Sequence, residues 1–225
     1  MPDLTLLYYS SNALPENTAV NFRSELINVT KGAFPIVSVT QKPIDFGKNI
    51  CIGDIGQSYY NLYQQMYAGI KEVKTKYVAL TEDDSLYNME HFDWRPPSDD
   101  VIMCNKSMYF LDKDFFWTKD HTGGFAFIAA TALVRDILDQ RFKRYPEEPM
   151  PRGYQKYQWR EIGQEVTLGF RNRPIVYFET ELPLITLCYW DATSGYPRRR
   201  EHNSIVKTDL PYWGNAAELR KRLLS

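Results

Sequence analysis

Residues 77–84 have the sequence Tyr77-Val78-Ala79-Leu80-Thr81-Glu82-Asp83-Asp84, an apolar run that ends in three consecutive acids. A short apolar run of this kind is typical of a buried strand. Three adjacent carboxylates repel one another, so the cluster is costly unless a cation neutralises it. Hard divalent cations prefer carboxylate oxygens, and ligands of open α/β sheets bind beyond the carboxyl ends of the strands. The stretch therefore predicts a binding site at a strand end, with an acidic loop or a helix N-terminus as the alternative.

The chain before this stretch predicts a strand, a helix and a second strand. Leu4–Tyr9 is a continuous apolar run. Pro15 is placed to begin a helix, apolar residues recur at helical spacing after it, and Gly32 ends the pattern. A second β-rich run covers 35–40. This order is that of a βαβ unit with a parallel pair of strands.

Two further segments lead up to the acids. Residues 42–56 contain Pro43 and several glycines, which predicts a long loop, and long loops in compact domains are often functional. Residues 57–73 predict a helix, because Leu62, Met66 and Ile70 recur along one face.

The second half of the chain has a less regular pattern. Its expected elements are a strand over 101–111, a loop over 112–124, an apolar segment over 125–138 that is helical in its second half, a polar connection over 141–153, a short helix over 157–168, a strand over 175–179, a loop over 191–211 and a helix over 216–224. We therefore expect one domain over 1–225, α/β in about its first 100 residues and α+β in the remainder.

The composition bounds the class of protein. The chain has 225 residues, of which 44% are hydrophobic and 15% aromatic, with a net charge of −1, so disorder is excluded as its main state. A pI near 6.3 argues against a wholly basic nucleic-acid binder. Because no apolar window of about 18 residues exists, we expect no membrane insertion.

The cysteines and the first residues predict a compartment. Cys51, Cys104 and Cys188 form no closely spaced pair, so we expect neither a disulfide framework nor a cysteine zinc site. The first residues lack the basic start and long apolar run of a signal peptide. A reducing, cytoplasmic location is the expectation.

The order of these elements resembles the GT-A glycosyltransferases, well over about residues 3–135 and loosely beyond them. The family carries a D-x-D-type motif after the corresponding strand, and Glu82-Asp83-Asp84 is similar to it, with Glu in the first position. The resemblance implies a Rossmann-like, mixed and mainly parallel sheet flanked by helices. It also implies sugar transfer from a nucleotide-diphosphate sugar, UDP-sugar above all. The first hundred residues would then bind the donor, and 101–225 the acceptor.

A narrower resemblance concerns residues 48–61 and 76–78. They are similar to phage-type transferases and to those associated with TET-like oxygenases, which glycosylate hydroxymethylated pyrimidines in DNA. This implies hydroxymethylated DNA as the acceptor and, for a phage-encoded enzyme, the host cytoplasm as the location. A glycan or small-molecule acceptor remains open, as does a non-catalytic module that binds carbohydrate or nucleic acid. A nucleotidyltransferase is disfavoured, because Tyr8–Pro15 contains no glycine for a phosphate loop.

The resemblance also implies roles for the donor half. Asp84 would coordinate Mg²⁺ or Mn²⁺ bridging the donor diphosphate, and Glu82 would contact the ribose or the metal's water. Such a cation would stabilise the charge that develops on the leaving phosphate. The residues implied around the donor are Tyr9, Ser10, Asn12, Gln57, Asn61, Glu82 and Asp83.

In the acceptor half the family offers a carboxylate base, for which Glu161, Glu165 and Asp191 are the candidates. Glu161 and Glu165 are one helical turn apart and could share a face, or could form surface ion pairs instead.

A basic loop follows these acids. In the family a C-terminal loop often closes over the diphosphate, so the resemblance makes His202 a candidate metal ligand and Arg198 and Arg200 candidates for binding phosphate oxygens. With a DNA acceptor the arginines could follow its backbone, and the alternative is a solvated basic surface.

Overall fold

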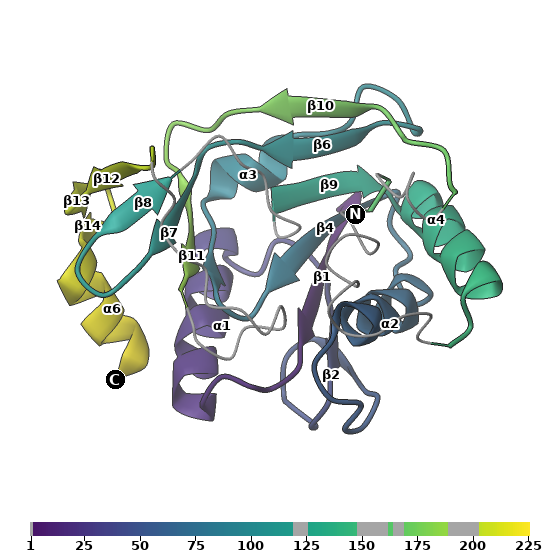
Figure 1. Cartoon of the computed structure of the whole chain (residues 1–225), viewed down its shortest axis with the longest axis horizontal. Coiled ribbons are helices and arrows are strands. Elements are labelled where there is room, and N and C mark those ends of the chain that lie inside the picture. Colours follow the sequence, from purple (N-terminus) through teal and green to yellow (C-terminus); the bar gives the residue numbers. More distant parts are fainter. Residues whose placement is uncertain (1, 119–125, 148–161, 164–168, 189–202) are drawn as a thin grey trace.

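A computed structural model describes residues 2–118, 126–147, 162–163, 169–188 and 203–225. Figure 1 shows a central sheet with helices against it and a second sheet beside it. The central sheet has seven strands in the order β10-β6-β9-β4-β1-β2-β3. These strands are β1 (Leu4–Ser10), β2 (Ile36–Thr40), β3 (Lys48–Cys51), β4 (Tyr77–Glu82), β6 (Ile102–Asn105), β9 (Phe127–Ala130) and β10 (Ile175–Phe178).

The central sheet is mixed and mainly parallel, as expected. β1 pairs in parallel with both β2 and β4, so that Leu6 lies opposite Ile36 on one side and Ala79 on the other. β3 joins β2 and β10 joins β6, again in parallel. β9 alone runs antiparallel to its neighbours in this sheet, β4 and β6. The parallel pairs β1–β2 and β1–β4 bring the carboxyl ends of three strands to one edge.

The second sheet has the order β12-β8-β7-β11-β5. Its strands are β5 (Ser85–Leu86), β7 (Met108–Leu111), β8 (Phe116–Thr118), β11 (Leu184–Leu187) and β12 (Ile205–Lys207), and a small ribbon is formed by β13 (Asp209–Leu210) and β14 (Gly214–Asn215). β5 pairs antiparallel with β11. The chain therefore leaves the central sheet after Glu82 and enters the second sheet at Ser85, across Asp83 and Asp84.

Helices cover both faces of the central sheet. They are α1 (Glu16–Thr30), α2 (Tyr59–Ile70), α3 (Met89–Asp93), α4 (Thr131–Arg144) and α6 (Ala216–Leu224). On one face, which we call the α2 face, Leu7 and Leu80 pack with Met66 of α2 and Val134 of α4. On the other, the α1 face, Leu6 and Tyr8 pack with Leu26 of α1 and with strands of the second sheet.

Several expectations for the second half were wrong in detail. The strand expected over 101–111 is two strands in different sheets, β6 and β7. The break is local, because the Asn105 side chain accepts a hydrogen bond from the Ser107 amide at 2.8 Å and turns the chain. Helix α4 extends to Arg144, into the expected connection over 141–153.

Short strands also occupy three expected loops, and one strand was not predicted at all. β3 lies in the loop expected over 42–56, β8 in that over 112–124, and β12 and β13 in that over 191–211, while β11 was not anticipated. β3 and β12 are edge strands with partly or fully exposed side chains, so they lack the apolar run that marks β1 and β4. The strands over 4–9, 35–40, 77–81 and 175–179 are confirmed, as are the helices that begin near residues 15, 57 and 216.

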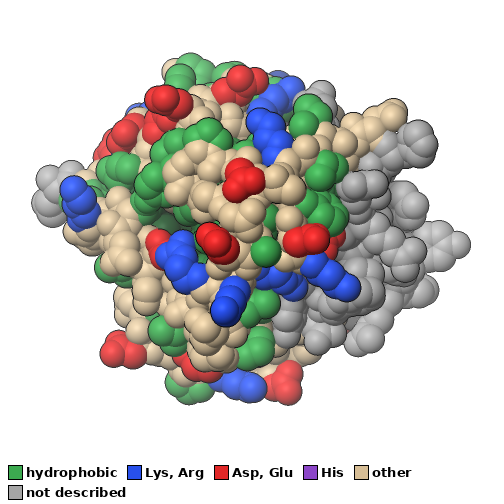
Figure 2. All heavy atoms as spheres, turned by 90° about the vertical axis from the view of Figure 1, so that its left-hand side faces the viewer, with side chains coloured by type: hydrophobic (Ala, Val, Ile, Leu, Met, Phe, Trp, Pro, Cys, Tyr) green, Lys and Arg blue, Asp and Glu red, His purple; other side chains and the backbone are tan. Residues whose placement is uncertain are grey.

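The described surface carries charges of both signs, and the three cysteines form no disulfide. Figure 2 shows the face toward α6 and the edge of the second sheet, where basic and acidic side chains are interspersed among the described residues. Cys51, Cys104 and Cys188 are free. Within the described ranges no helix has both the length and the apolar character needed to cross a membrane.

Candidate functional site

The acidic triplet lies where β1 and β4 end side by side. Tyr9 is in register with Glu82, and its hydroxyl donates a hydrogen bond to Glu82 Oε1 at 2.8 Å. Side chains alternate along a strand, and Tyr9 shares the buried cluster of Leu7 and Leu80 on the α2 face. This bond therefore ties the two strand ends together on the α2 face of the sheet.

A second bond ties the same strand ends on the α1 face. Ser10 follows Tyr9, and its hydroxyl donates to Asp83 Oδ2. The Ser10 oxygen in turn accepts a hydrogen bond from the Asn12 backbone amide at 2.9 Å. Asn12 has a left-handed backbone with φ of 56°, a conformation that Asn tolerates better than most residues. The turn after β1 thus aims the Ser10 hydroxyl at the acids.

The electrostatics of Asp83 reflect this crowding. Burial and the charge of Asp84 raise the pKa of Asp83 to about 7, although the hydrogen bond from Ser10 and the charge of Arg23 oppose the rise. A carboxyl group whose pKa is raised by a neighbouring carboxylate lies in a site with excess negative charge. Such a site favours a cation beside it.

Asp84 is held by the second sheet. Its Oδ1 accepts hydrogen bonds from the hydroxyls of Ser85 at 3.1 Å and of Thr186 at 3.4 Å. Its backbone carbonyl accepts a hydrogen bond from the Leu187 amide at 2.8 Å. The position of Asp84 therefore depends on β11, a strand about a hundred residues further along the chain.

The acids suit a hard divalent cation. Glu82 and Asp84 offer carboxylate oxygens, the donors that Mg²⁺ and Mn²⁺ prefer. In the part of the chain that the structure describes, no three His, Cys, Asp or Glu side chains are grouped to hold a metal ion by themselves. Mg²⁺ is commonly bound by one or two carboxylates together with substrate phosphates. Glu82 and Asp84 are two carboxylates of the kind that this mode of binding uses.

Two of the residues expected around a nucleobase, Asn12 and Asn61, use their side chains in hydrogen bonds to the backbone of neighbouring loops. Asn12 Oδ1 accepts hydrogen bonds from the backbone amides of Gln41 and Lys42, both at 2.8 Å. The Asn61 side chain donates to the Ile55 carbonyl. Gln57 reaches the Ser11 hydroxyl from the start of α2 at 3.4 Å. Asn12 and Asn61 therefore shape the loops around the site.

Sequence reasoning missed two buried glutamines that complete this architecture. Gln41 donates to the Gly56 carbonyl at 2.8 Å and accepts from the Ile55 and Gly56 amides at 3.1 and 3.2 Å. Gln65 donates to the carbonyls of Ser10, at 2.6 Å, and Val39, at 3.2 Å, and so bridges the ends of β1 and β2. The available signal for Gln65 was an uncharged polar residue beside the apolar face of a predicted helix.

The remaining candidates lie outside the described residues. They are Glu161, Glu165, Asp191, Arg198, Arg200 and His202. Their roles stay predictions, as does the division into a donor half and an acceptor half.

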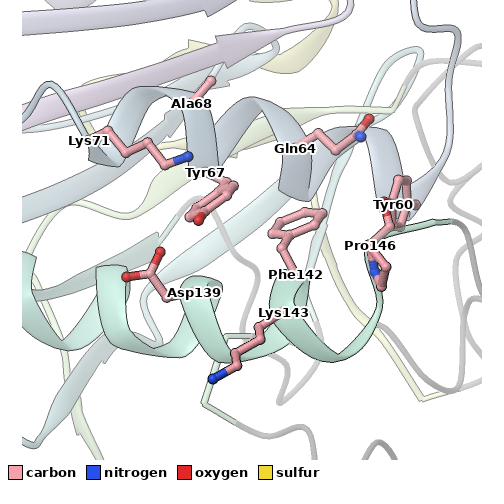
Figure 3. Close-up of a pocket in the computed structure, with 9 residues that line it drawn as sticks. All are labelled: Tyr60, Gln64, Tyr67, Ala68, Lys71, Asp139, Phe142, Lys143 and Pro146. Atoms are coloured by element: carbon pink, nitrogen blue, oxygen red, sulfur yellow. The ribbon is translucent and has the colours of Figure 1, made fainter.

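A separate hollow of about 650 Å³ lies between α2 and α4 (Figure 3). Its aromatic side chains are engaged with one another and with neighbouring groups. The Tyr67 ring stacks on the Phe142 ring with 4.9 Å between the ring centroids. Lys71 Nζ lies 3.5 Å from the centroid of the Tyr67 ring. The Tyr60 ring meets the edge of Phe142 at 5.5 Å. The hollow is lined mainly by residues of α2 and α4, and none of Glu82, Asp83 and Asp84 is among the residues that line it.

Comparison with known proteins identifies the fold. No protein-family model and no curated protein sequence matches the chain. Among solved structures, residues 1–349 of TarS from S. aureus superpose with a TM-score of 0.52 at 12% identity, over 83% of this chain and 61% of that one. A glycosyltransferase involved in glycosylation of the major capsid of PBCV-1 superposes with a TM-score of 0.51 at 8% identity, over 83% of this chain and 93% of that one. The same TarS fragment has been solved in complex with UDP-GlcNAc, and that structure superposes with a TM-score of 0.48. The chain thus spans about three fifths of the TarS fragment, and the GT-A-like fold is confirmed.

Proposed function

We propose that this protein is a metal-dependent glycosyltransferase that moves a sugar from a nucleotide-diphosphate sugar, UDP-sugar in the first instance, to an acceptor hydroxyl. The observation that carries the proposal is the acidic turn Glu82–Asp84 at the shared carboxyl edge of β1 and β4, tied to β1 by Tyr9 and Ser10. Ligands of open α/β sheets bind at such an edge. The fold shared with a glycosyltransferase involved in glycosylation of the major capsid of PBCV-1 supports the same reaction class.

The residues have separable tasks in this reaction. Glu82 and Asp84 would hold Mg²⁺ or Mn²⁺, which when bound stabilises negative charge on the leaving diphosphate. Tyr9 and Ser10 orient two of the three carboxyl groups, because each donates a hydrogen bond to one of them. A carboxylate fixed before the reaction needs no reorganisation as charge develops.

The nucleobase would lie against the turn after β1 and the loop that precedes α2. Asn12 holds the first of these to the end of β2, and Gln41 and Asn61 hold the second. Such hydrogen bonds preorganise loop backbone that would otherwise lose conformational entropy on binding. A hydrogen bond from Gln57 to the Ser11 hydroxyl joins the two loops.

The proposed acceptor hydroxyl is that of a 5-hydroxymethylpyrimidine in DNA. The resemblance of residues 48–61 supports 5-hydroxymethylpyrimidine in DNA, and a glycan or small molecule is the alternative. The acceptor hydroxyl must lose a proton, and Glu161, Glu165 and Asp191 are the proposed bases. Release of UDP from UDP-GlcNAc or UDP-glucose, with hydroxymethylated and unmodified oligonucleotides compared, distinguishes these acceptors.

The experiment that tests the donor site is calorimetric titration with UDP, with and without Mn²⁺. We expect metal-dependent binding that weakens at least tenfold in Asp84→Asn, because this change removes a charged ligand and keeps the shape. The matched control is Asp99→Asn. Asp99 is an exposed acid beside Lys76, at the opposite end of β4, and their ion pair of 3.2 Å contributes little to stability.

Two results would contradict the proposal. If UDP binds equally well with and without Mn²⁺, the metal takes no part in UDP binding. If Asp84→Asn leaves the affinity for UDP unchanged, the acidic turn is not part of the UDP site. A protein that binds carbohydrate or nucleic acid but shows neither effect would be a non-catalytic module.

A further inference from the structure

The outer edge of β10 is an unprotected strand edge in the part of the chain that the structure describes. The edge strands of the two large sheets are β10, β3, β12 and β5. β3 contains Lys48, β12 contains Lys207 and β5 has only two residues, and both lysines and short strands hinder pairing at a sheet edge. β10 has the uncharged sequence Ile-Val-Tyr-Phe and lies at the outside of the central sheet (Figure 1). An edge of this kind is a template for a further strand.

The backbone of β10 offers hydrogen bonds toward this outer edge. The carbonyls of Pro174 and Phe178 accept backbone hydrogen bonds from β6 and from the residue directly after β6, both at 2.9 Å, so these carbonyls face inward. Along a strand, the amide and carbonyl of successive residues point to alternate sides. The backbone groups of Ile175 and Tyr177 therefore point outward.

The side chains beside this edge are apolar and exposed. Val176 is 39% exposed and Tyr177 46%. Trp94 is 41% exposed, and its ring lies against Phe178 with 5.0 Å between the ring centroids. Because side chains alternate along a strand, Val176 shares the face of Phe178, whereas Tyr177 lies on the other face. A strand added here would cover apolar surface on both faces of the sheet.

The charges that flank β10 complement those of a second copy. Two arginines precede the strand and two glutamates follow it: Arg171, Arg173, Glu179 and Glu181. In an antiparallel pair of β10 strands with Val176 opposite itself, Arg171 lies opposite Glu181 of the other copy. In the same register Arg173 lies opposite Glu179, and the two-fold axis repeats both contacts. Registers centred one residue to either side align only one of the two arginines with a glutamate.

We propose that two copies of this chain associate through antiparallel pairing of their β10 strands, centred on Val176, into a symmetric dimer with one continuous sheet. Ile175 of each copy then lies opposite Tyr177 of the other. Since both residues point their backbone groups outward, each of these pairs can exchange two backbone hydrogen bonds. The charged flanks select this register over its neighbours.

The test is sedimentation equilibrium of the whole chain over about 1–300 μM, a range that brackets the micromolar dissociation constant expected of a small interface. We expect a monomer–dimer equilibrium that weakens as the salt concentration rises, because salt screens the exposed charges. Tyr177→Pro removes an amide that points outward and leaves the bonds to β6 in place, so the chain should fold and its dimer should weaken about tenfold or more.

Charge reversal tests the register. Arg171→Glu places a second acid opposite Glu181 at both symmetric contacts, so dimerisation should weaken about tenfold. Glu181→Arg should have a similar effect, and the double variant should recover affinity to within about threefold of the wild type. Arg173 is less suitable, because it already pairs with Asp136 of α4 at 2.9 Å. The matched control is Lys221→Glu, the same change of charge at an exposed position of α6, which should leave the dimer unchanged.

The inference is overturned if the wild type stays monomeric over the whole range or forms larger assemblies in place of a dimer. It is also overturned by a dimer that Arg171→Glu or a folded Tyr177→Pro leaves at full strength, or by a double variant that binds no tighter than the single ones. Thermal unfolding shows whether each variant is folded. The charge variants change exposed side chains, so they decide the outcome alone where Tyr177→Pro does not fold.

Discussion

At the scale of single residues, His91 of α3 lies outside the acidic turn and departs far from its ordinary chemistry. It is fully buried and stacks on Phe178 at 5.7 Å. Its Nδ1 lies 3.5 Å from the Asn105 amide nitrogen, and its Nε2 has no hydrogen-bond partner among the described residues. Burial lowers the pKa of His91 to about 3. The imidazole is therefore neutral in the folded protein throughout the physiological range.

This shift predicts a loss of stability in acid. In the unfolded chain His91 is protonated below about pH 6.5, whereas in the folded chain it is protonated only below about pH 3. The free energy of unfolding should therefore fall as the pH falls through this window, by about 1.4 kcal/mol per pH unit from this residue. Urea unfolding of the wild type and His91→Leu between pH 7.5 and 5 measures the effect.

Only the difference between the two proteins bears on this prediction. At pH 7.5 that difference reflects packing, because His91 is neutral in both states. Toward pH 5 the wild type should lose about 2 kcal/mol relative to His91→Leu. A difference that stays constant with pH would show that His91 titrates alike in the folded and unfolded chains.

At this scale the sequence predicted the acids but not what holds them. Three consecutive carboxylates are unusual in any context, so Glu82–Asp84 could be identified without a structure. Gln41 and Gln65 are ordinary residues in ordinary positions, and they become important only because the ends of β1, β2 and α2 meet around them. Their roles come from tertiary contacts, which local pattern does not encode.

At the scale of elements, α2 lies unusually close to the central sheet, and Gly69 permits this. A Cβ atom at Gly69 would lie 2.3 Å from Leu7 Cδ1 and 2.7 Å from Val39 Cγ2. Leu7 and Val39 are fully buried in the core of the α2 face, so neither side chain has space to withdraw. The glycine near the end of α2 is therefore required by packing against β1 and β2.

This packing predicts that Gly69→Ala lowers the stability of the protein. Helix propensity alone favours Gly69→Ala by about 1 kcal/mol. The clash should outweigh that gain, because overpacking a close-packed core costs about 1–3 kcal/mol and here two side chains must move. We expect Gly69→Ala to be destabilised in urea unfolding by about 1–2 kcal/mol net. A more stable variant would show that α2 can withdraw from the sheet without cost.

Strands could be predicted from the sequence where both faces of the sheet are covered. β1 and β4 lie in the middle of the central sheet and are covered on both faces, so their sequences are continuous apolar runs. β3 and β12 are edges, and β5 has two residues, so none of them carries enough periodicity to be recognised. The run over 101–111 was predicted as one strand because apolar residues stand on both sides of Asn105-Lys106-Ser107, the short polar interruption where the chain turns from β6 to β7.

On the scale of the whole molecule, the acidic turn joins two sheets. Glu82 ends β4 of the central sheet, and Ser85 begins β5 of the second. The turn between them is anchored by β1 on one side and by β11 on the other, through Ser10 and Thr186. β11 is distant in sequence and was not predicted, so no argument from the sequence could have connected it to Asp84. This junction makes the second sheet part of the site.

The junction predicts that a buried hydroxyl in β11 contributes to donor binding. Thr186→Val keeps the shape of the side chain and removes the hydroxyl that lies 3.4 Å from Asp84 Oδ1. Loss of one such hydrogen bond to a carboxylate should cost about 1–2 kcal/mol. We expect the affinity for UDP with Mn²⁺ to fall about fivefold or more in titration calorimetry, because Asp84 is less firmly placed. The matched control is Thr208→Val, since the exposed Thr208 hydroxyl also donates to a neighbouring carboxylate, that of Asp209, at 2.8 Å. Equal affinities in the two variants would mean that the central sheet alone positions Asp84 and that the second sheet only covers the α1 face.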